Sequence, residues 1–209
     1  MKEITWARKD DSTYNNFLFG VPLDHWSRRY EYPFTLRHGD FKDNQLTLDA
    51  AGGDAPLQWF LAGKTGCVIN IDQDAEALER GEKQWNRPNI IRKRGSLADL
   101  SCLPEFFDRV VCVSVLEHSP DYGSIIEATW NALLKGGRLI LTFDVASYAR
   151  WNHNIDLERA GEIAKWYGLE LPDFPADGLK AVFPEINRQD NDPESVELKV
   201  LCLAVDKGE

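Results

Sequence analysis

Two short stretches of the chain combine small and acidic residues in a way that suits binding of a nucleoside. The first, DAAGGDA at 49–55, follows a hydrophobic run, and its small residues let backbone N–H groups approach a ligand. The second is Asp72, which ends another hydrophobic run nineteen residues beyond Gly53, where a carboxylate can accept both hydroxyls of a ribose. Together they predict a nucleoside ligand. The alternative role for Asp72 is a helix N-cap, for which Asp74 competes.

Strands and helices that alternate along the chain would bring these stretches to one edge of a sheet. Runs typical of strands lie at 45–50, 66–72, 89–94, 109–116, 138–144 and 196–207. Segments with helical spacing of apolar residues lie at 55–63, 74–85, 122–135 and 155–171. This order predicts an α/β fold, with a doubly wound, mostly parallel sheet, helices on both faces and ligands beyond the carboxyl ends of the strands.

Length and composition indicate one domain. The chain has 209 residues, 43% of them hydrophobic, which is enough for one full core, and no low-complexity linker divides it. We expect a single domain over 1–209. It would consist of a helical lid or appendage at 1–44, a nucleoside-binding core at 45–145 and a segment with the last strands at 146–209.

Charge and cysteine usage narrow the classes of partner. The net charge of −10 disfavours nucleic acid and favours a small or cationic partner. The four cysteines lie mostly in apolar runs without a C-x-x-C pair, as expected of reduced thiols in a cytoplasmic protein. The first residues contain no apolar leader, and no apolar run reaches the roughly 18 residues that span a bilayer. We therefore expect no membrane contact.

The order of four motifs resembles the class I S-adenosylmethionine-dependent methyltransferases, especially the type 11 group. The motifs are LDAAGGDA, VINIDQD, RGSLADLSCLPEFFDRVVCVSVLEH and LLKGGRLILTFD, and the resemblance covers roughly residues 45 to 145. In the family's first motif, acidic-x-G-x-G-x-G, Asp49 and Gly53 match. Ala51 and Ala55 replace glycines, and Gly52 is an additional one. The resemblance implies a Rossmann-like, seven-stranded sheet with S-adenosyl-L-methionine as cofactor.

The resemblance also implies which residues contact the cofactor. The turn at 49–55 would hold the methionine and ribose part, and Asp72 the ribose hydroxyls. Where the family often has Gly-Asp after the third strand, this chain has Gly95-Ser96. Leu97 would then cover the adenine ring, while Asp99 caps a turn. The expected cofactor-binding residues are Asp49, Ala51, Gly52, Gly53, Asp72, Gln73, Ser96, Leu97, Ser114 and Val115.

The acceptor side is predicted from three places in the chain. His118, at the end of SVLEH, is a candidate general base near neutral pH, or a residue that shapes its loop. Arg29 and Tyr32 precede the first strand of the core, where family members often place a lid over the cofactor. The alternative there is a helix docked by its aromatic face. Tyr148, Arg150 and Trp151 are further wall candidates, or parts of a packed aromatic loop.

These observations predict a methyltransferase that acts on a small-molecule acceptor. The alternatives are a non-catalytic S-adenosylmethionine-binding module or partner subunit, an NAD-dependent oxidoreductase and a nucleic-acid methyltransferase. The missing third glycine of the dinucleotide fingerprint disfavours the oxidoreductase, and the acidic charge disfavours nucleic acid. We expect no metal. The acceptor's chemical class and the oligomeric state stay open.

Overall fold

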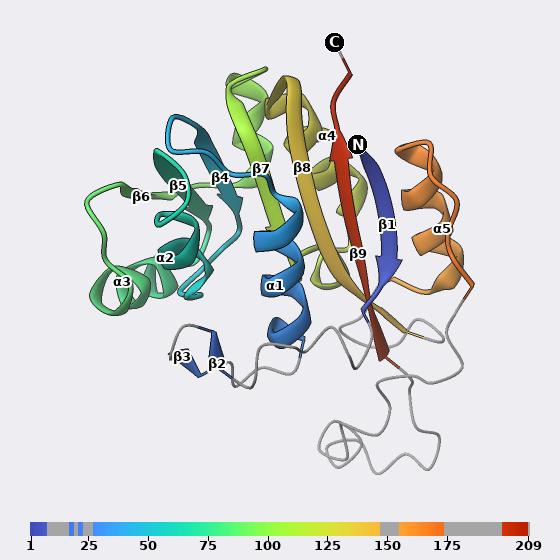
Figure 1. Cartoon of the computed structure of the whole chain (residues 1–209), viewed down its shortest axis with the longest axis horizontal. Helices are drawn as coiled ribbons and strands as arrows, with labels where there is room; N and C mark the ends of the chain where they lie inside the picture. Colours follow the sequence, from blue (N-terminus) through green and yellow to red (C-terminus); the bar gives the residue numbers. More distant parts are fainter. Residues whose placement is uncertain (8–16, 19–20, 23–26, 147–154, 174–197, 209) are drawn as a thin grey trace.

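The structure, a computed structural model, describes residues 1–7, 17–18, 21–22, 27–146, 155–173 and 198–208 (Figure 1). Within these residues, seven strands form one sheet in the order β1-β9-β8-β7-β4-β5-β6, and β2 and β3 form a separate pair. The strands are β1 (Lys2–Trp6), β2 (Phe17–Leu18), β3 (Val21–Pro22), β4 (Leu46–Ala50), β5 (Cys67–Asp72), β6 (Ile90–Arg94), β7 (Phe107–Val113), β8 (Leu133–Ala146) and β9 (Leu198–Asp206).

Helices cover both faces of this sheet. Strands β4 to β8 pair in parallel, and β9 pairs antiparallel with β8. The doubly wound, mostly parallel, seven-stranded sheet predicted from the sequence is thus confirmed. No helix in the described ranges is long and apolar enough to span a bilayer. The helices are α1 (Arg28–His38), α2 (Leu57–Leu61), α3 (Ala75–Gln84), α4 (Tyr122–Ala132) and α5 (Leu157–Trp166), with two short 3₁₀ helices, η2 (Leu97–Cys102) and η3 (Leu116–His118).

Alternate residues of the central strands divide the interior into two cores. In β7, Val110 and Cys112 point into the core beneath α4 and α5, whereas Val111 points into the core beneath α1 and α2. A strand buried on both faces needs apolar residues at consecutive positions, because its side chains alternate between the faces. This accounts for the unbroken apolar run of β7.

The N-terminal segment differs from the expected helical appendage at 1–44. Residues Lys2–Trp6 form β1, the edge strand of the sheet, which pairs antiparallel with β9. Its alternate residues Ile4 and Trp6 pack on the core beneath α4 and α5, so the strand supplies core as well as backbone pairing. Among the described residues of this segment, helix is found at 28–38. Helix α4 also ends earlier than its sequence suggests, at Ala132, because β8 begins at the next residue.

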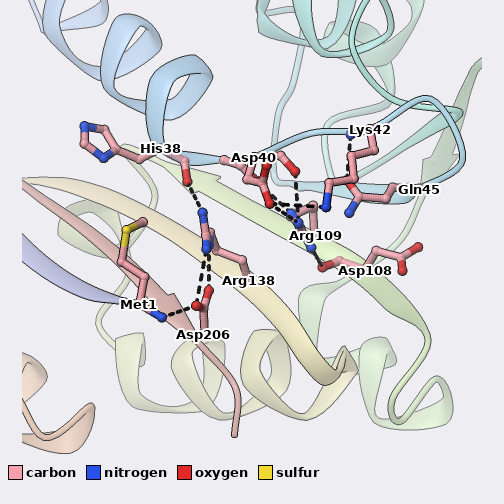
Figure 2. A network of polar contacts seen from close by, with 10 residues as sticks. Met1, His38, Asp40, Lys42, Gln45, Asp108, Arg109, Arg138 and Asp206 are labelled. Carbon is pink, nitrogen blue, oxygen red and sulfur yellow. Dashed lines mark hydrogen bonds and ion pairs between the residues drawn. The ribbon is translucent and has the colours of Figure 1, made fainter.

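Two arginines anchor the C-terminal end of α1 to the sheet (Figure 2). Arg138 of β8 donates to the carbonyl of His38 at 2.8 Å and forms an ion pair with Asp206 of β9 at 2.6 Å. Arg109 of β7 donates to the carbonyl of Gly39 at 2.7 Å. Because the last carbonyls of a helix lack partners within it, these cations stabilise the helix end. They hold the C-terminal end of α1 at the edge of the sheet opposite the carboxyl ends of the parallel strands.

Candidate functional site

The turn after β4 has a backbone conformation that favours small residues. Ala51 and Gly53 have positive φ angles of 55° and 51°. Neighbouring side chains hold the turn: Asn70 of β5 accepts from the N–H of Gly52 at 3.2 Å and donates to the carbonyl of Gly53 at 2.9 Å. Gln58 of α2 donates to the same carbonyl at 2.9 Å. Both amides are buried, so the turn is fixed before any ligand arrives.

Asp72 joins this turn to the end of β5. Its Oδ2 accepts from the N–H of Gly53 at 2.9 Å, and its Oδ1 accepts from the N–H of Asp74 at 2.8 Å. Asp74 is the N-cap of α3, since its Oδ1 accepts from Glu76 and Ala77. The capping alternative for Asp72 is therefore filled by Asp74. Each Asp72 oxygen keeps a second lone pair for a ligand hydroxyl.

A cavity of about 420 Å³, the larger cavity, opens beside Asp72 at the carboxyl ends of β4, β5 and β6. Its size falls within the range of small-molecule sites. Seven of the residues predicted to form the site lie on its wall, including His118 on the side of η3. Its lining is Ala51, Ile71, Asp72, Gln73, Gly95, Ser96, Leu97, Ala98, Val115, His118, Ser119, Pro120, Asp121, Ser124 and Ile125.

Ser96 and Asp99 form a capping box at the start of η2. Asp99 accepts from the N–H of Ser96 at 2.9 Å, and the Ser96 hydroxyl accepts from the N–H of Ala98 at 3.2 Å. Asp99 thus caps a turn, as its sequence context suggests, and is absent from the cavity wall as described. The buried Leu97 lies on that wall, where it offers an apolar surface to a ring.

A second cavity of about 60 Å³, the smaller cavity, adjoins the first and shares Ala51 with it. It has room only for a small polar group, and charged side chains of opposite sign, Arg28 and Asp49, face it. The first turn of α1 and the ends of β4 and β7 form its walls. Its lining is Arg28, Tyr32, Asp49, Ala51, Gly52, Ala55, Leu57, Val113 and Ser114.

Asp49 is a buried acid with an unused oxygen. Its side chain is 2% exposed, and its Oδ2 has no hydrogen-bond partner. Burial, together with the negative charge of Asp72, raises the pKa of Asp49 to about 7, although Arg28 opposes the shift. A Cβ at position 52 would collide with this Oδ2, which accounts for the glycine there. The unpaired oxygen is available to a cationic ligand group.

Arg28 and Glu31 of α1 form a buried ion pair over the ends of β7 and β8. Glu31 accepts from the hydroxyls of Ser114 and Thr142, each at 2.7 Å, and Arg28 also contacts the Ser114 hydroxyl. Although burial works against its charge, the Arg28 guanidinium and these hydroxyls hold the pKa of Glu31 below its usual value. The first turn of α1 is thereby fixed, with Arg28 facing the smaller cavity.

Two further buried carboxyl groups lie next to this pair. Glu117 of η3 accepts from the N–H of Asp144 in β8 at 3.3 Å, while its Oε2 and the Oδ1 of Asp144 have no partner. Burial and the charge of Glu31 raise the pKa of Glu117 to about 8. Burial and Glu117 likewise raise the pKa of Asp144. Among the residues that the structure describes, no group of acidic, histidine and cysteine side chains suits a metal ion.

Most of the predicted site residues line one of the two cavities, and the others line neither cavity or lie outside the described residues. The cofactor candidates lie on the two cavities, except Gly53, whose N–H binds Asp72. Of the lid candidates, Tyr32 lines the smaller cavity, whereas Arg29 is absent from both linings and Arg28 takes the place expected for it. Tyr148, Arg150 and Trp151 lie outside the described residues.

Several residues of the site were not identified from the sequence. Arg28 directly precedes Arg29 in an aromatic and basic stretch, and the helical phase that selects it over Arg29 is not visible in the sequence. Asn70 and Gln58 could have been singled out from the sequence. Each is a polar residue inside an apolar run, and a buried polar side chain needs a hydrogen-bond partner. The sequence gives no sign that Glu31 and Asp144 lie near the site, since only the docking of α1 brings them together.

Known proteins share this chain's motifs and architecture. Residues 48–141 match the family described as a methyltransferase domain. The ubiquinone biosynthesis O-methyltransferase of Glaesserella parasuis is 32% identical over 121 residues, which is 53% of this chain and 51% of that protein. The chain thus matches about half the length of this curated relative.

Solved structures confirm the fold at lower sequence identity. Phosphoethanolamine N-methyltransferase 2 of Haemonchus contortus, with S-adenosyl-L-methionine bound, superposes with a TM-score of 0.65 at 18% identity and covers 93% of this chain and 55% of that one. An arsenic(III) S-adenosylmethionine methyltransferase of Chlamydomonas reinhardtii gives a TM-score of 0.60 at 16% identity, over 81% and 65%. Residues 48–141, which carry the matched motifs, are thus similar to methyltransferase domains, and the seven-stranded sheet has the fold of these solved structures.

Proposed function

We propose that this chain transfers the methyl group of S-adenosylmethionine to a small-molecule acceptor. The observation that carries the proposal is the pair of adjoining cavities, which share Ala51 and differ in chemistry. The larger one has a ribose-binding acid and an apolar wall, as adenosine requires. The smaller one presents Arg28 and Asp49, which match the carboxylate and the ammonium of the methionine part.

On the adenosine side, Asp72 accepts the two ribose hydroxyls, and Gln73 lies next to it. Leu97 and Val115 of the larger cavity's wall offer apolar surface to the ring, and the exposed His118 lies on the same wall. On the methionine side, the Arg28 guanidinium receives the carboxylate. Its position is set by Glu31 and Ser114, so little side-chain freedom is lost when the cofactor binds.

The reaction needs alignment more than a dedicated acid or base. Bound S-adenosylmethionine would supply an electrophilic methyl group on sulfur, and the acceptor's lone pair would have to lie in line with the carbon–sulfur bond that breaks. A hydroxyl would lose its proton during or after the transfer, whereas an ammonium would have to lose a proton first. Holding the two partners in this geometry contributes about 7–11 kcal/mol. His118 and solvent are the proposed proton acceptors. The position of His118 on the nucleoside wall also fits a loop-shaping role.

The acceptor is proposed to bind over the carboxyl ends of β7 and β8, beyond the smaller cavity. Arg29, Tyr32, Tyr148, Arg150 and Trp151 remain the proposed wall residues, and Tyr32 also borders the methionine part. The named relatives include an O-methyltransferase and an N-methyltransferase, which supports a hydroxyl or an amine as the receiving group. The acidic overall charge supports a small molecule over a nucleic acid.

Calorimetric titration with S-adenosylhomocysteine tests the cofactor assignment. Replacing Asp72 by Asn removes a charge that accepts hydrogen bonds worth roughly 1.5–3 kcal/mol each, so affinity should fall about 10- to 150-fold. Asp74→Asn is the matched control, because Asp74 caps α3 and is absent from the described cavity walls. Equal affinity of the two variants would contradict the assignment.

Transfer of labelled methyl from S-adenosylmethionine to a fractionated metabolite pool tests the activity. We expect incorporation into a small molecule that is lost in Asp72→Asn and retained in Asp74→Asn. Tight binding of S-adenosylhomocysteine without any transfer across such pools would contradict the proposed enzyme and indicate a binding module.

A further inference from the structure

A third cavity of about 350 Å³, the edge cavity, lies between β1 and α1 and has no part in the proposed reaction. Helix α1 packs on β9 and β8, while β1 lies beyond them at the sheet edge (Figure 1). The space between the helix and the edge strand is therefore left open. Its lining is Glu3, Thr5, Ala7, Tyr30, Pro33, Phe34, Arg37, His38 and Cys202.

The edge cavity has an apolar interior and a charged rim. Tyr30 and Phe34 of α1 are buried on one side, and Ala7 and Cys202 are buried on the other. At the rim, the Glu3 carboxylate contacts His38, whose Nδ1 lies 2.9 Å away. The aromatic rings of Tyr30 and Phe34 in this lining suit a flat ring with polar substituents, and the size is at the lower end of small-molecule sites.

Arg37 supplies the unmatched charge at this rim. It is exposed, and it forms no ion pair with any residue that the structure describes. A guanidinium beside an apolar slot is the group that best receives a planar carboxylate, through two parallel hydrogen bonds. The edge cavity therefore fits an aromatic or similarly flat molecule that carries a carboxylate.

Helix α1 links the edge cavity to the smaller cavity. Within its 11 residues, Tyr30, Phe34 and Arg37 line the edge cavity, while Arg28 and Tyr32 line the smaller one. A rigid element that contacts two sites transmits the effect of one on the other when its position or stability changes. Restraint of α1 by a ligand in the edge cavity would therefore act on the placement of Arg28.

The intrinsic stability of α1 is low, which makes it sensitive to such a ligand. Pro33 lies inside the helix, where its ring removes one helical hydrogen bond, and the Ser27 side chain makes no N-capping hydrogen bond. The C-terminal end is anchored by Arg109 and Arg138 (Figure 2). The N-terminal half, which holds Arg28, thus depends on tertiary contacts to keep its position.

We propose that the edge cavity binds a flat, carboxylate-bearing small molecule, and that its occupancy tightens cofactor binding through α1. The binding rests on the edge cavity alone, whereas the coupling rests on the proposed function. Because linkage is reciprocal, the cofactor must tighten binding at the edge cavity by the same factor. Couplings of this type typically lie at about 5- to 150-fold.

The first experiment measures binding of 2-naphthoate, with neutral 2-naphthamide as the matched probe, by calorimetry and ligand-observed NMR. We expect 2-naphthoate to bind the wild type about tenfold more tightly than Arg37→Gln, a difference of about 1.4 kcal/mol. The amide should bind both proteins equally. Lys64→Gln is the control, since it removes one exposed positive charge elsewhere. Equal binding of 2-naphthoate to wild type and Arg37→Gln, or no binding at all, would overturn the site.

The second experiment separates the edge cavity from the cofactor site. Asp72→Asn should keep the 2-naphthoate affinity of the wild type. If this variant loses 2-naphthoate binding, or if S-adenosylhomocysteine competes with 2-naphthoate, the probe binds in the larger cavity and the proposal is overturned. Saturating 2-naphthoate should tighten S-adenosylhomocysteine at least fivefold in the wild type, and Arg37→Gln should need about ten times more 2-naphthoate for the same effect. Unchanged affinity in the wild type would refute the coupling. Failure of S-adenosylhomocysteine to bind would instead refute the proposed function.

Discussion

Cofactor affinity is expected to fall about 100-fold between pH 8 and pH 5, because binding requires Asp49 to be ionised. Burial raises the pKa of Asp49 to about 7 in the free protein, with a further contribution from Asp72. The ammonium of the cofactor would meet the unpaired Oδ2 of Asp49 and select its charged form. Below pH 7 each pH unit then costs about tenfold in affinity, or about 1.4 kcal/mol.

Calorimetry with S-adenosylhomocysteine in buffers of different ionisation enthalpy measures this effect directly. At pH 6 binding should release close to one proton, and above pH 8 almost none. Asp49→Asn should show a nearly flat pH profile with affinity near the acidic limit of the wild type. His118→Gln is the control for the imidazole on the larger cavity, and it should keep the wild-type profile. A flat profile in the wild type would refute the role given to Asp49.

The same shift predicts the pH dependence of stability. The pKa of Asp49 is raised in the folded state, so its contribution to stability is full below its unfolded pKa of about 4 and is lost as the pH rises through about 7. The loss amounts to about 4 kcal/mol at most. Urea unfolding of the unliganded protein should show this decline between pH 4 and pH 7. In Asp49→Asn the decline should be smaller, and the part due to Glu117 and Asp144 should remain.

Arg28→Gln should lower the free energy of unfolding by about 3–5 kcal/mol, because it leaves the Glu31 carboxylate buried without its partner. Adding Glu31→Gln should restore stability in urea titrations without restoring S-adenosylhomocysteine affinity, and recovery of that affinity would exclude Arg28 as a cofactor contact. Gly53→Val should cost about 1–3 kcal/mol and abolish cofactor binding, since a β-branched residue is strained at φ 51°; unchanged binding by calorimetry would contradict this. Burial raises the pKa of Glu117 to about 8, so its ionisation should lower the free energy of unfolding as the pH rises toward 8. Glu117→Gln should remove this contribution, as measured by urea unfolding at pH 5 and pH 8.

The central fold was predictable because its signals are local. The central strand β7 is buried on both faces, and its residues 110–113 read as an unbroken apolar run. The turn at 49–55 and Asp72 were recognisable because a turn of small residues and an acid at the end of the next strand are typical of nucleoside sites in such folds. The same regularity allowed seven residues of the larger cavity's wall to be named from the sequence.

The parts that could not be predicted depend on contacts between distant segments. Strand β1 pairs with β9, and Met1 meets Asp206 across a separation of 205 residues, for which the five residues of β1 contain no local sign. The choice of Arg28 over Arg29 depends on the rotation of α1 about its axis. The carboxyl cluster around Glu117 forms only when α1 docks on β7 and β8.

A crystal structure of the protein with S-adenosylhomocysteine bound tests the central claim most directly. The account predicts adenosine in the larger cavity with both ribose hydroxyls within hydrogen-bond distance of Asp72. It also predicts the methionine carboxylate on Arg28 and its ammonium on Asp49. Ligand density in another place, or a ribose that does not contact Asp72, would contradict the account.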